Sequence, residues 1–424
     1  MLRHPNKAGT RAVRVAGAAI AATALFLTGC SSAAPGNNEG DPDGAGEVTF
    51  FSWDNEEVMQ PLIDEFEDQN PDITIKFSHA PPVQEYIDTL QKRLMSGNAA
   101  DVFILGNHTE QAGGGFVKDI SDTAAAEAVS DFSREMHTYE GNVYGISIAS
   151  WGGGLLVNKD LTAKVGVDTP PKTWDEFLQL AQDLKDAGIT PYLEAGDGIS
   201  TAIMSLLGQA GDEAGVDFES EIFEGKTTFT DAWTEPLETW SELYSSGLVT
   251  KDAAALTGQL INDEFNNERV AMVSTGSWQI GAAREALGED ANLEFWPIPS
   301  PDGEAFWAGA ASPPYAINSK AKNPVGAQKW VDFLASPEGS EIYHDTTGSI
   351  TTTAGFQPEL DPALDLMYQA VLDGKIYCTW QTWPGANSAP LDATFLAKVQ
   401  ETMLGQSDAA QITAALDEKF ATLG

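Results

Sequence analysis

Cysteine, histidine and basic residues are scarce in this sequence. Its 424 residues include 2 cysteines, 5 histidines and 23 lysines and arginines, against 63 aspartates and glutamates. The resulting net charge of −40 disfavours binding to nucleic acid or to an anionic surface, because like charges repel. The charge is compatible with a solvated acidic surface, and also with attraction for a cationic ligand such as a peptide.

The few cysteines and histidines predict neither a disulfide nor a metal site. Cys30 has another predicted use, described below, and Cys378 is interpreted as a small apolar residue. The histidines show no metal-ligand spacing, and no cofactor is predicted. The sequence also lacks a Gly-x-Ser-x-Gly elbow, and the triple glycine at 152–154 lacks the lysine of a phosphate loop. The many carboxylates leave a glycosidase pair open.

Long hydrophobic runs are missing apart from one near the N-terminus. The run Val15–Leu27 follows several basic residues and is too short to span a membrane, which is typical of a signal peptide. It ends in Leu27-Thr28-Gly29-Cys30, which resembles a bacterial lipobox. Residues 1–29 are therefore predicted to be a lipoprotein signal peptide, with lipidation at Cys30. Residues 30–46 have no periodic apolar residues and are predicted to be a flexible tether at the extracellular face of the cytoplasmic membrane.

Apolar periodicity predicts alternating strands and helices after the tether. Strands are expected at 48–52, 73–77 and 100–105, with an amphipathic helix in each interval. This order predicts a doubly wound parallel sheet, in which ligands bind beyond the carboxyl ends of the strands. The residues at those ends are Trp53, Asp54, His79, Asn107 and His108.

The segment 144–171 is unusual in its glycine content. Two short strands are predicted, Tyr144–Ala149 and Leu155–Asn158, with Trp151 and the triple glycine between them. Glycines allow a second backbone or a ligand to approach closely. A helix is predicted to begin after Thr173, which has capping-box spacing to Glu176.

The segment 144–171 resembles the crossover between lobes in extracellular solute-binding proteins of carbohydrate ABC transporters, the maltose-binding-protein-like group, family 1. Residues 261–278, which end in Gly-Ser-Trp, and residues 307–318 resemble a second-lobe signature and a return crossing of that group. The resemblance covers residues 47–424. It implies an α/β, two-lobed periplasmic-binding-protein-like fold (type II), each lobe a sheet flanked by helices. The expected lobes, joined by hinge crossings, are 47–149 plus 311–360 and 150–310 plus 361–424.

The 11 tryptophans exceed what a core of this size requires. Five are expected in the core: Trp174, Trp233, Trp240, Trp296 and Trp330. Six lie at element ends or in loops, where an indole can stack on the C–H face of a sugar ring: Trp53, Trp151, Trp278, Trp307, Trp380 and Trp383. In the family, the position of Trp278 supplies a stacking aromatic.

Three polar residues are candidates for contacts with sugar hydroxyls. These are Asp54, Asn107 and His108. Asp54 is alternatively a helix N-cap, and the other two are alternatively surface loop residues.

The resemblance and the tryptophans together predict a sugar-binding protein rather than an enzyme. The expected ligand is an oligosaccharide, delivered by hinge closure to the permease subunits of an ABC importer. The protein is expected to be a lipid-anchored monomer. Two alternatives remain: a binder of peptides or other polar solutes, and a secreted glycoside hydrolase.

Overall fold

The structure is a computed structural model that describes residues 42–80, 83–301, 305–351, 353–379, 383 and 385–423. The predicted signal peptide, Cys30 and Trp380 lie outside the described residues. Within the described ranges, no helix has the length and apolar character needed to cross a membrane.

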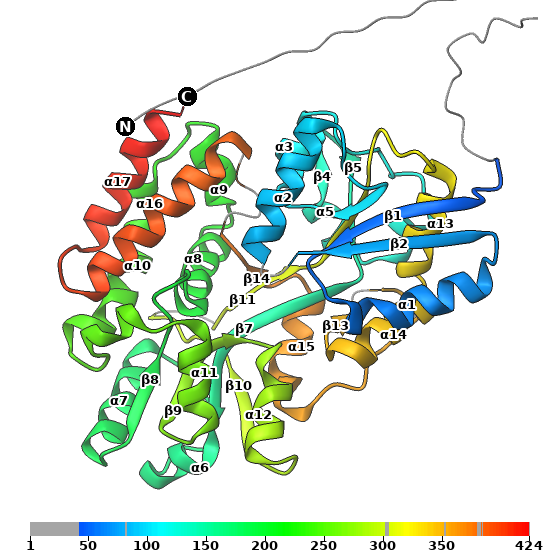
Figure 1. Ribbon diagram of the computed structural model, residues 1–424. Helices are drawn as coiled ribbons and strands as arrows, with labels where there is room; N and C mark the ends of the chain where they lie inside the picture. The colour runs from blue at the N-terminus through cyan, green and yellow to red at the C-terminus, as the bar shows by residue number, and fades with distance from the viewer. Residues whose placement is uncertain are drawn as a thin grey trace, which may run out of the picture. The chain divides into compact units, whose positions relative to one another are not determined.

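The first sheet has the strand order β2-β1-β3-β12-β6. Its strands β1 and β2 lie side by side in Figure 1. β1 is parallel to β2 and β3, whereas β12 is antiparallel to β3 and β6. The strands are β1 (Gly46–Ser52), β2 (Ile73–His79), β3 (Val102–Ile104), β6 (Ile146–Ser147) and β12 (Pro314–Ile317). The helices of this first lobe are α1 (Glu56–Gln69), α2 (Val83–Ser96), α3 (His108–Gly113), α4 (Ala124–Ala128), α5 (Asp131–Met136), α13 (Pro324–Leu334) and α14 (Pro337–Thr347). A small hairpin, β4 (Thr138–Tyr139) and β5 (Asn142–Val143), follows α5.

The second sheet has the order β14-β11-β7-β9-β8, with β10 and β13 also paired to β7. Its strands are β7 (Ala149–Asn158), β8 (Thr190–Leu193), β9 (Val270–Gly276), β10 (Leu293–Trp296), β11 (Trp307–Ala311), β13 (Ile350–Thr351) and β14 (Ile376–Tyr377). The helices of this second lobe are α6 (Lys159–Thr162), α7 (Trp174–Asp186), α8 (Thr201–Ala214), α9 (Phe218–Phe223), α10 (Phe229–Ser245), α11 (Gly258–Asn266), α12 (Gln279–Leu287), α15 (Asp365–Leu372), α16 (Gly385–Met403) and α17 (Ala409–Ala421).

The chain passes between the two sheets three times. It goes from β6 to β7, returns from β11 to β12, and leaves again from α14 to β13. Ile350 and Ala354 contact different lobes. Ile350 pairs with Ser150 of β7, whereas the Ala354 N–H donates to the carbonyl of Ala128, the last residue of α4. The five tryptophans expected in the core are all buried.

β7 is one continuous strand, so the prediction of two strands joined by a glycine loop was wrong. The glycines are needed for close packing inside the sheet. A Cβ on Gly152 would lie 2.3 Å from the Met367 sulfur, and one on Gly153 would lie 2.7 Å from the Thr201 methyl. A Cβ on Gly154 would lie 2.5 Å from the carbonyl oxygen of Trp296 in β10. The glycines therefore let α15, α8 and β10 lie directly on β7.

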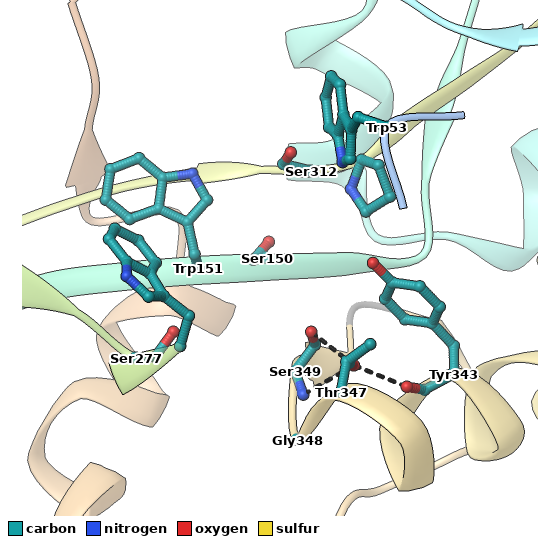
Figure 2. A pocket seen from close by; sticks show the side chains of 11 residues that line it. Trp53, Ser150, Trp151, Ser277, Ser312, Tyr343, Thr347, Gly348 and Ser349 are labelled. Carbon is teal, nitrogen blue, oxygen red and sulfur yellow. Dashed lines mark hydrogen bonds between the residues drawn. The ribbon is translucent and has the colours of Figure 1, made fainter. Parts of the chain in front are cut away.

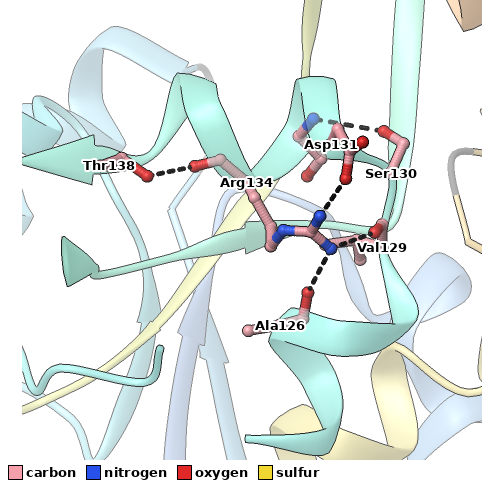
Figure 3. Close-up of polar contacts among 7 residues, drawn as sticks. Ala126, Val129, Ser130, Asp131, Arg134 and Thr138 are labelled. Atoms are coloured by element: carbon pink, nitrogen blue, oxygen red, sulfur yellow. Dashed lines mark hydrogen bonds and ion pairs between the residues drawn. The ribbon is translucent and has the colours of Figure 1, made fainter. Parts of the chain in front are cut away.

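Arg134 fixes the short helices α4 and α5 against each other (Figure 3). Its guanidinium donates to the carbonyls of Ala126 and Val129, at 3.1 and 3.2 Å, and pairs with Asp131. Its own carbonyl accepts from the Thr138 hydroxyl at 2.8 Å. These bonds set the position of the end of α5, where His137 follows as the C-cap.

The packing at β7 predicts a specific cost for Gly154→Ala. The new methyl would meet a backbone carbonyl that has little freedom to move, so we expect a loss of about 1–3 kcal/mol in the free energy of unfolding. Gly198→Ala is the control, because a Cβ there meets nothing within 4 Å. Urea unfolding of the two variants checks this. Equal stabilities would show that β7 tolerates side chains.

Candidate functional site

Two neighbouring cavities lie between the lobes, and we call them together the interlobe cleft. The smaller has a volume of about 130 Å³ and the larger about 500 Å³. Both are lined by Trp53, Trp151, Trp278 and Ser312. The smaller cavity is further lined by Ser150, Ser277, Pro313, Tyr343, Thr347, Gly348 and Ser349 (Figure 2). The larger is further lined by Val83, Ile87, Leu105, Gly106, His108, His137, Pro314 and Cys378.

Three of the predicted tryptophans meet in this cleft. Trp53 follows β1 of the first lobe, and its ring lies edge-on to Tyr86 with centroids 5.5 Å apart. Trp151 belongs to β7, and Trp278 immediately precedes α12, both in the second lobe. The rings of Trp151 and Trp278 are 5.3 Å apart at 66°. Trp278 is 59% exposed, which is unusual for an indole that has partners to pack against.

The glycine of the Gly-Ser-Trp motif makes room for the Trp278 ring. A Cβ on Gly276 would lie only 2.0 Å from an atom of that ring. The Ser277 N–H donates to the Gly152 carbonyl at 2.8 Å, which ties the motif to β7. The motif therefore holds the Trp278 indole in close contact with Gly276 at the end of β9.

The smaller cavity is lined mainly by hydroxyl groups. The Ser150 hydroxyl is buried and has no hydrogen-bond partner among the described residues. The Thr347 hydroxyl donates to the Tyr343 carbonyl at 2.6 Å, and it can accept from the Ser349 hydroxyl, which lies 2.8 Å away (Figure 2). Among the described residues that line either cavity, none is Asp, Glu, Lys or Arg. The described residues that line the smaller cavity therefore supply polar hydroxyl groups and no carboxyl, amine, guanidinium or imidazole side chain.

Asp54 lies behind the wall of the cleft. Its side chain accepts a 3.5 Å hydrogen bond from the Tyr343 hydroxyl, and its N–H donates to the Ser52 hydroxyl at 2.9 Å. The N-cap of α1 is Asn55, so Asp54 does not have the alternative role considered for it. Burial raises the pKa of Asp54 from an ordinary 3.8 to about 6, although hydrogen bonds from Tyr343 and Ser52 oppose this rise.

The polar residues after β3 divide between two roles. His108 lines the larger cavity. Asn107 is the N-cap of α3, and its amide donates to the Trp383 carbonyl of the second lobe at 3.3 Å. The Thr109 hydroxyl donates to the same carbonyl, also at 3.3 Å. His79 is exposed at the end of β2 and is not among the residues that line the cavities.

Two predicted tryptophans lie in the core of the second lobe instead of the cleft. Trp307 is buried in the cluster around Leu156 and Phe295. Trp383 is buried beside Trp233, and its indole N–H donates to Glu219. Neither residue lines the two cavities.

Several lining residues were missed by the sequence analysis. His137, Tyr343 and Cys378 stand far from the strand ends used to select candidates, and Thr347 and Ser349 lie at the end of α14. His137 and Cys378 had a signal in the sequence, as scarce residue types. The spacing of His137 to other histidines gave no reason to select it, and Cys378 was interpreted as a small apolar residue.

Residues 61–368 match the family described as bacterial extracellular solute-binding protein. The chain belongs to this family. The resemblance stated from the sequence is thereby confirmed, and family members are binding proteins.

Three similar proteins agree with this assignment. The multiple sugar-binding protein of Streptococcus mutans is 22% identical over 90% of this chain and 91% of its own length. The maltooligosaccharide ABC transporter solute-binding lipoprotein of Streptococcus pneumoniae is 25% identical over 62% of each chain. A solved family 1 extracellular solute-binding protein from Bifidobacterium longum subsp. infantis superposes with a TM-score of 0.78 at 28% identity, covering 89% of this chain and 100% of that one. The predicted two-lobed α/β fold is confirmed.

The buried Asp54 predicts a stability that depends on pH. Because its folded-state pKa exceeds that of the unfolded chain, its contribution is most favourable below pH 3.8 and is lost as pH rises through about 6. Asp54→Asn removes this loss, so we expect the variant to be more stable than the unmodified protein at pH 8, by about 1–3 kcal/mol.

Urea unfolding at pH 4 and pH 8 measures the effect, and the gain should shrink at pH 4. Asp72→Asn, at an exposed position, is the control and should show no such gain. A gain of equal size at both pH values would contradict the assigned pKa.

Proposed function

We propose that this protein binds an uncharged oligosaccharide in the interlobe cleft and does not transform it. The observation that carries the proposal is the convergence of Trp53, Trp151 and Trp278 on a cleft whose other polar side chains are hydroxyls, imidazoles and one thiol. Indoles match the apolar C–H faces of pyranose rings, and hydroxyl groups match their polar edges. Two relatives are named multiple sugar-binding protein and maltooligosaccharide ABC transporter solute-binding lipoprotein, and these names support the same ligand class.

The uncharged lining favours a sugar over a cationic peptide. A peptide drawn in by the net charge of −40 would need carboxylates at the site to hold its basic groups. The described lining residues of both cavities include none.

The same lining argues against a glycoside hydrolase. That chemistry uses two carboxyl groups on either side of the scissile bond. Asp54 lies behind the wall, and no second carboxylate is among the described lining residues. Binding without hydrolysis is the activity that the cleft supports.

Closure of the lobes would couple binding to transport. Trp53 and Tyr343 belong to the first lobe, whereas Trp151 and Trp278 belong to the second. A sugar ring between them contacts both sets only when the lobes are closed, so it stabilises the closed form by those extra contacts. The closed form then delivers its sugar to the permease of an ABC importer. The protein acts as a monomer in this scheme.

The N-terminal segment would keep the protein near that permease. The lipobox-like Leu27-Thr28-Gly29-Cys30 supports lipidation at Cys30 after removal of residues 1–29. A relative that is named a lipoprotein supports the same localisation, at the extracellular face of the cytoplasmic membrane.

The role of the tryptophans predicts that Trp278→Ala weakens sugar binding by about 1–3 kcal/mol while leaving stability nearly unchanged. Gly276→Ala should reproduce the loss, because the added methyl displaces the Trp278 ring. Gly281→Ala in α12 is the matched control, since a Cβ there meets nothing within 4 Å.

Calorimetric titration with a panel of neutral mono-, di- and trisaccharides, including maltotriose and raffinose, measures the affinities, and thermal melts measure the stabilities. If no sugar in the panel binds or raises the melting temperature of the unmodified protein, the proposal is wrong.

The lipobox predicts the behaviour of Cys30→Ser in a bacterial host. The unmodified chain should partition into the detergent phase of a Triton X-114 extraction, and the variant should enter the aqueous phase because it lacks the acyl chains. Cys378→Ser is the control and should partition like the unmodified chain. Equal partitioning of the Cys30 variant and the unmodified protein would exclude lipidation at this residue.

A further inference from the structure

Two histidines lie side by side in the wall of the larger cavity. His108 is the first residue of α3, and His137 follows α5. Both are buried, and their rings are 6.0 Å apart at 78°. Both line the larger cavity, as does Cys378 of the second lobe.

Each histidine has hydrogen-bonding capacity that the described residues do not use. One ring nitrogen of His137, Nε2, lies 2.8 Å from the Ser147 hydroxyl. Its other ring nitrogen, Nδ1, is buried without a partner. The described residues include no hydrogen-bond partner for the ring of His108. Since a buried polar group is costly when unpaired, the Nδ1 atom of His137 indicates a place where another molecule supplies the missing bond. The His108 ring lies beside it and lines the same cavity.

The rings are neutral at physiological pH. Burial lowers the pKa of His108 to about 4. Burial, and then the neighbouring His108, lower the pKa of His137 to about 3. A neutral imidazole has one donor and one acceptor nitrogen. A hydroxyl group, which can both donate and accept, complements either tautomer, whereas a carboxylate or phosphate can only accept and an ammonium can only donate.

A metal ion is not the missing partner. Cys378 lines the same cavity, yet no group of three His, Cys, Asp or Glu side chains within the described ranges is arranged to bind a metal. Burial raises the pKa of the Cys378 thiol well above its ordinary value, which keeps it protonated and makes it a poor metal ligand.

The rest of the larger cavity provides an apolar surface and a fixed geometry. Its walls include the side chains of Val83, Ile87, Leu105 and Pro314. A sugar ring has an apolar C–H face for such a surface and hydroxyls for the histidines. The Arg134 network holds the end of α5 (Figure 3). The His137 N–H donates to the Arg134 carbonyl at 3.1 Å.

The two cavities share the three tryptophans, so a molecule that fills both extends past the indoles in two directions. We propose that His108 and His137 form a hydroxyl-binding subsite that takes the second ring of an uncharged oligosaccharide, beyond the ring held by the tryptophans. This inference rests on the proposed function. It names His108 and His137 as the residues that would favour a ligand of more than one ring and without charge.

The test combines NMR of histidine ring nitrogens with titrations of variants, using maltotriose, raffinose and their component monosaccharides. Both trisaccharides should shift the ring resonances of His108 and His137, whereas those of the exposed His79 should stay fixed. His108→Leu should weaken trisaccharide binding by about tenfold and leave monosaccharide binding unchanged. His108→Gln should recover part of the loss, because an amide again offers a donor and an acceptor.

The outcomes separate this inference from the proposed function. The subsite is wrong if a trisaccharide binds and Trp278→Ala weakens that binding, yet His108→Leu binds as tightly as the unmodified protein and the histidine resonances do not move. That result leaves the proposed function intact. If neither trisaccharide nor any other panel sugar binds, both are overturned. The NMR measurement uses the unmodified protein, so it tests whether His137 contacts the trisaccharide even if variants of His137 do not fold. An unchanged His137 resonance in the presence of a bound trisaccharide contradicts the contact.

Discussion

Close packing along β7 is the constraint on which the rest of the structure depends. The strand follows β6 of the first sheet and then pairs with β9, β10, β11 and β13 of the second. Its three consecutive glycines allow helices and a neighbouring backbone to reach it without intervening side chains. Because β7 is held so tightly, Ser150 and Trp151 have fixed positions at the junction of the lobes. The cleft is built around that point.

The acidic character of the protein stops at the cleft wall. A chain with a net charge of −40 repels anions and attracts cations on balance. The described groups that face the two cavities are hydroxyls, indoles, aliphatic side chains and neutral imidazoles. Asp54, which accepts a hydrogen bond from Tyr343, is half-buried and does not line either cavity, and burial raises its pKa. The net charge of the protein therefore does not indicate the chemistry of the ligand that the cleft binds. Composition alone would suggest a cationic ligand, whereas the lining of the cleft suggests a neutral one.

The sequence predicted the parts that local patterns determine. Apolar periodicity located α1, α2 and the strands around them, because those elements bury one face at regular spacing. The Gly-Ser-Trp motif located Trp278, since its geometry is local. Local patterns failed for Trp307 and Trp383, which look like loop residues but are buried by helices distant in sequence. They also failed for β7, where the glycines indicate packing partners instead of a turn, and for His137, whose neighbour His108 is brought to it only by the fold.

The start of α3 joins two functions in adjacent residues. Asn107 bonds the Trp383 carbonyl across the lobes, and His108 faces the larger cavity. A rotation that separates Asn107 from the second lobe must also move the adjacent His108, and with it part of the wall of the larger cavity. The angle between the lobes and the width of the larger cavity therefore change together. If the lobes close on a sugar as proposed, the degree of closure would depend on the size of that sugar. A partner that recognises only the fully closed form would then respond to ligand size without contacting the ligand.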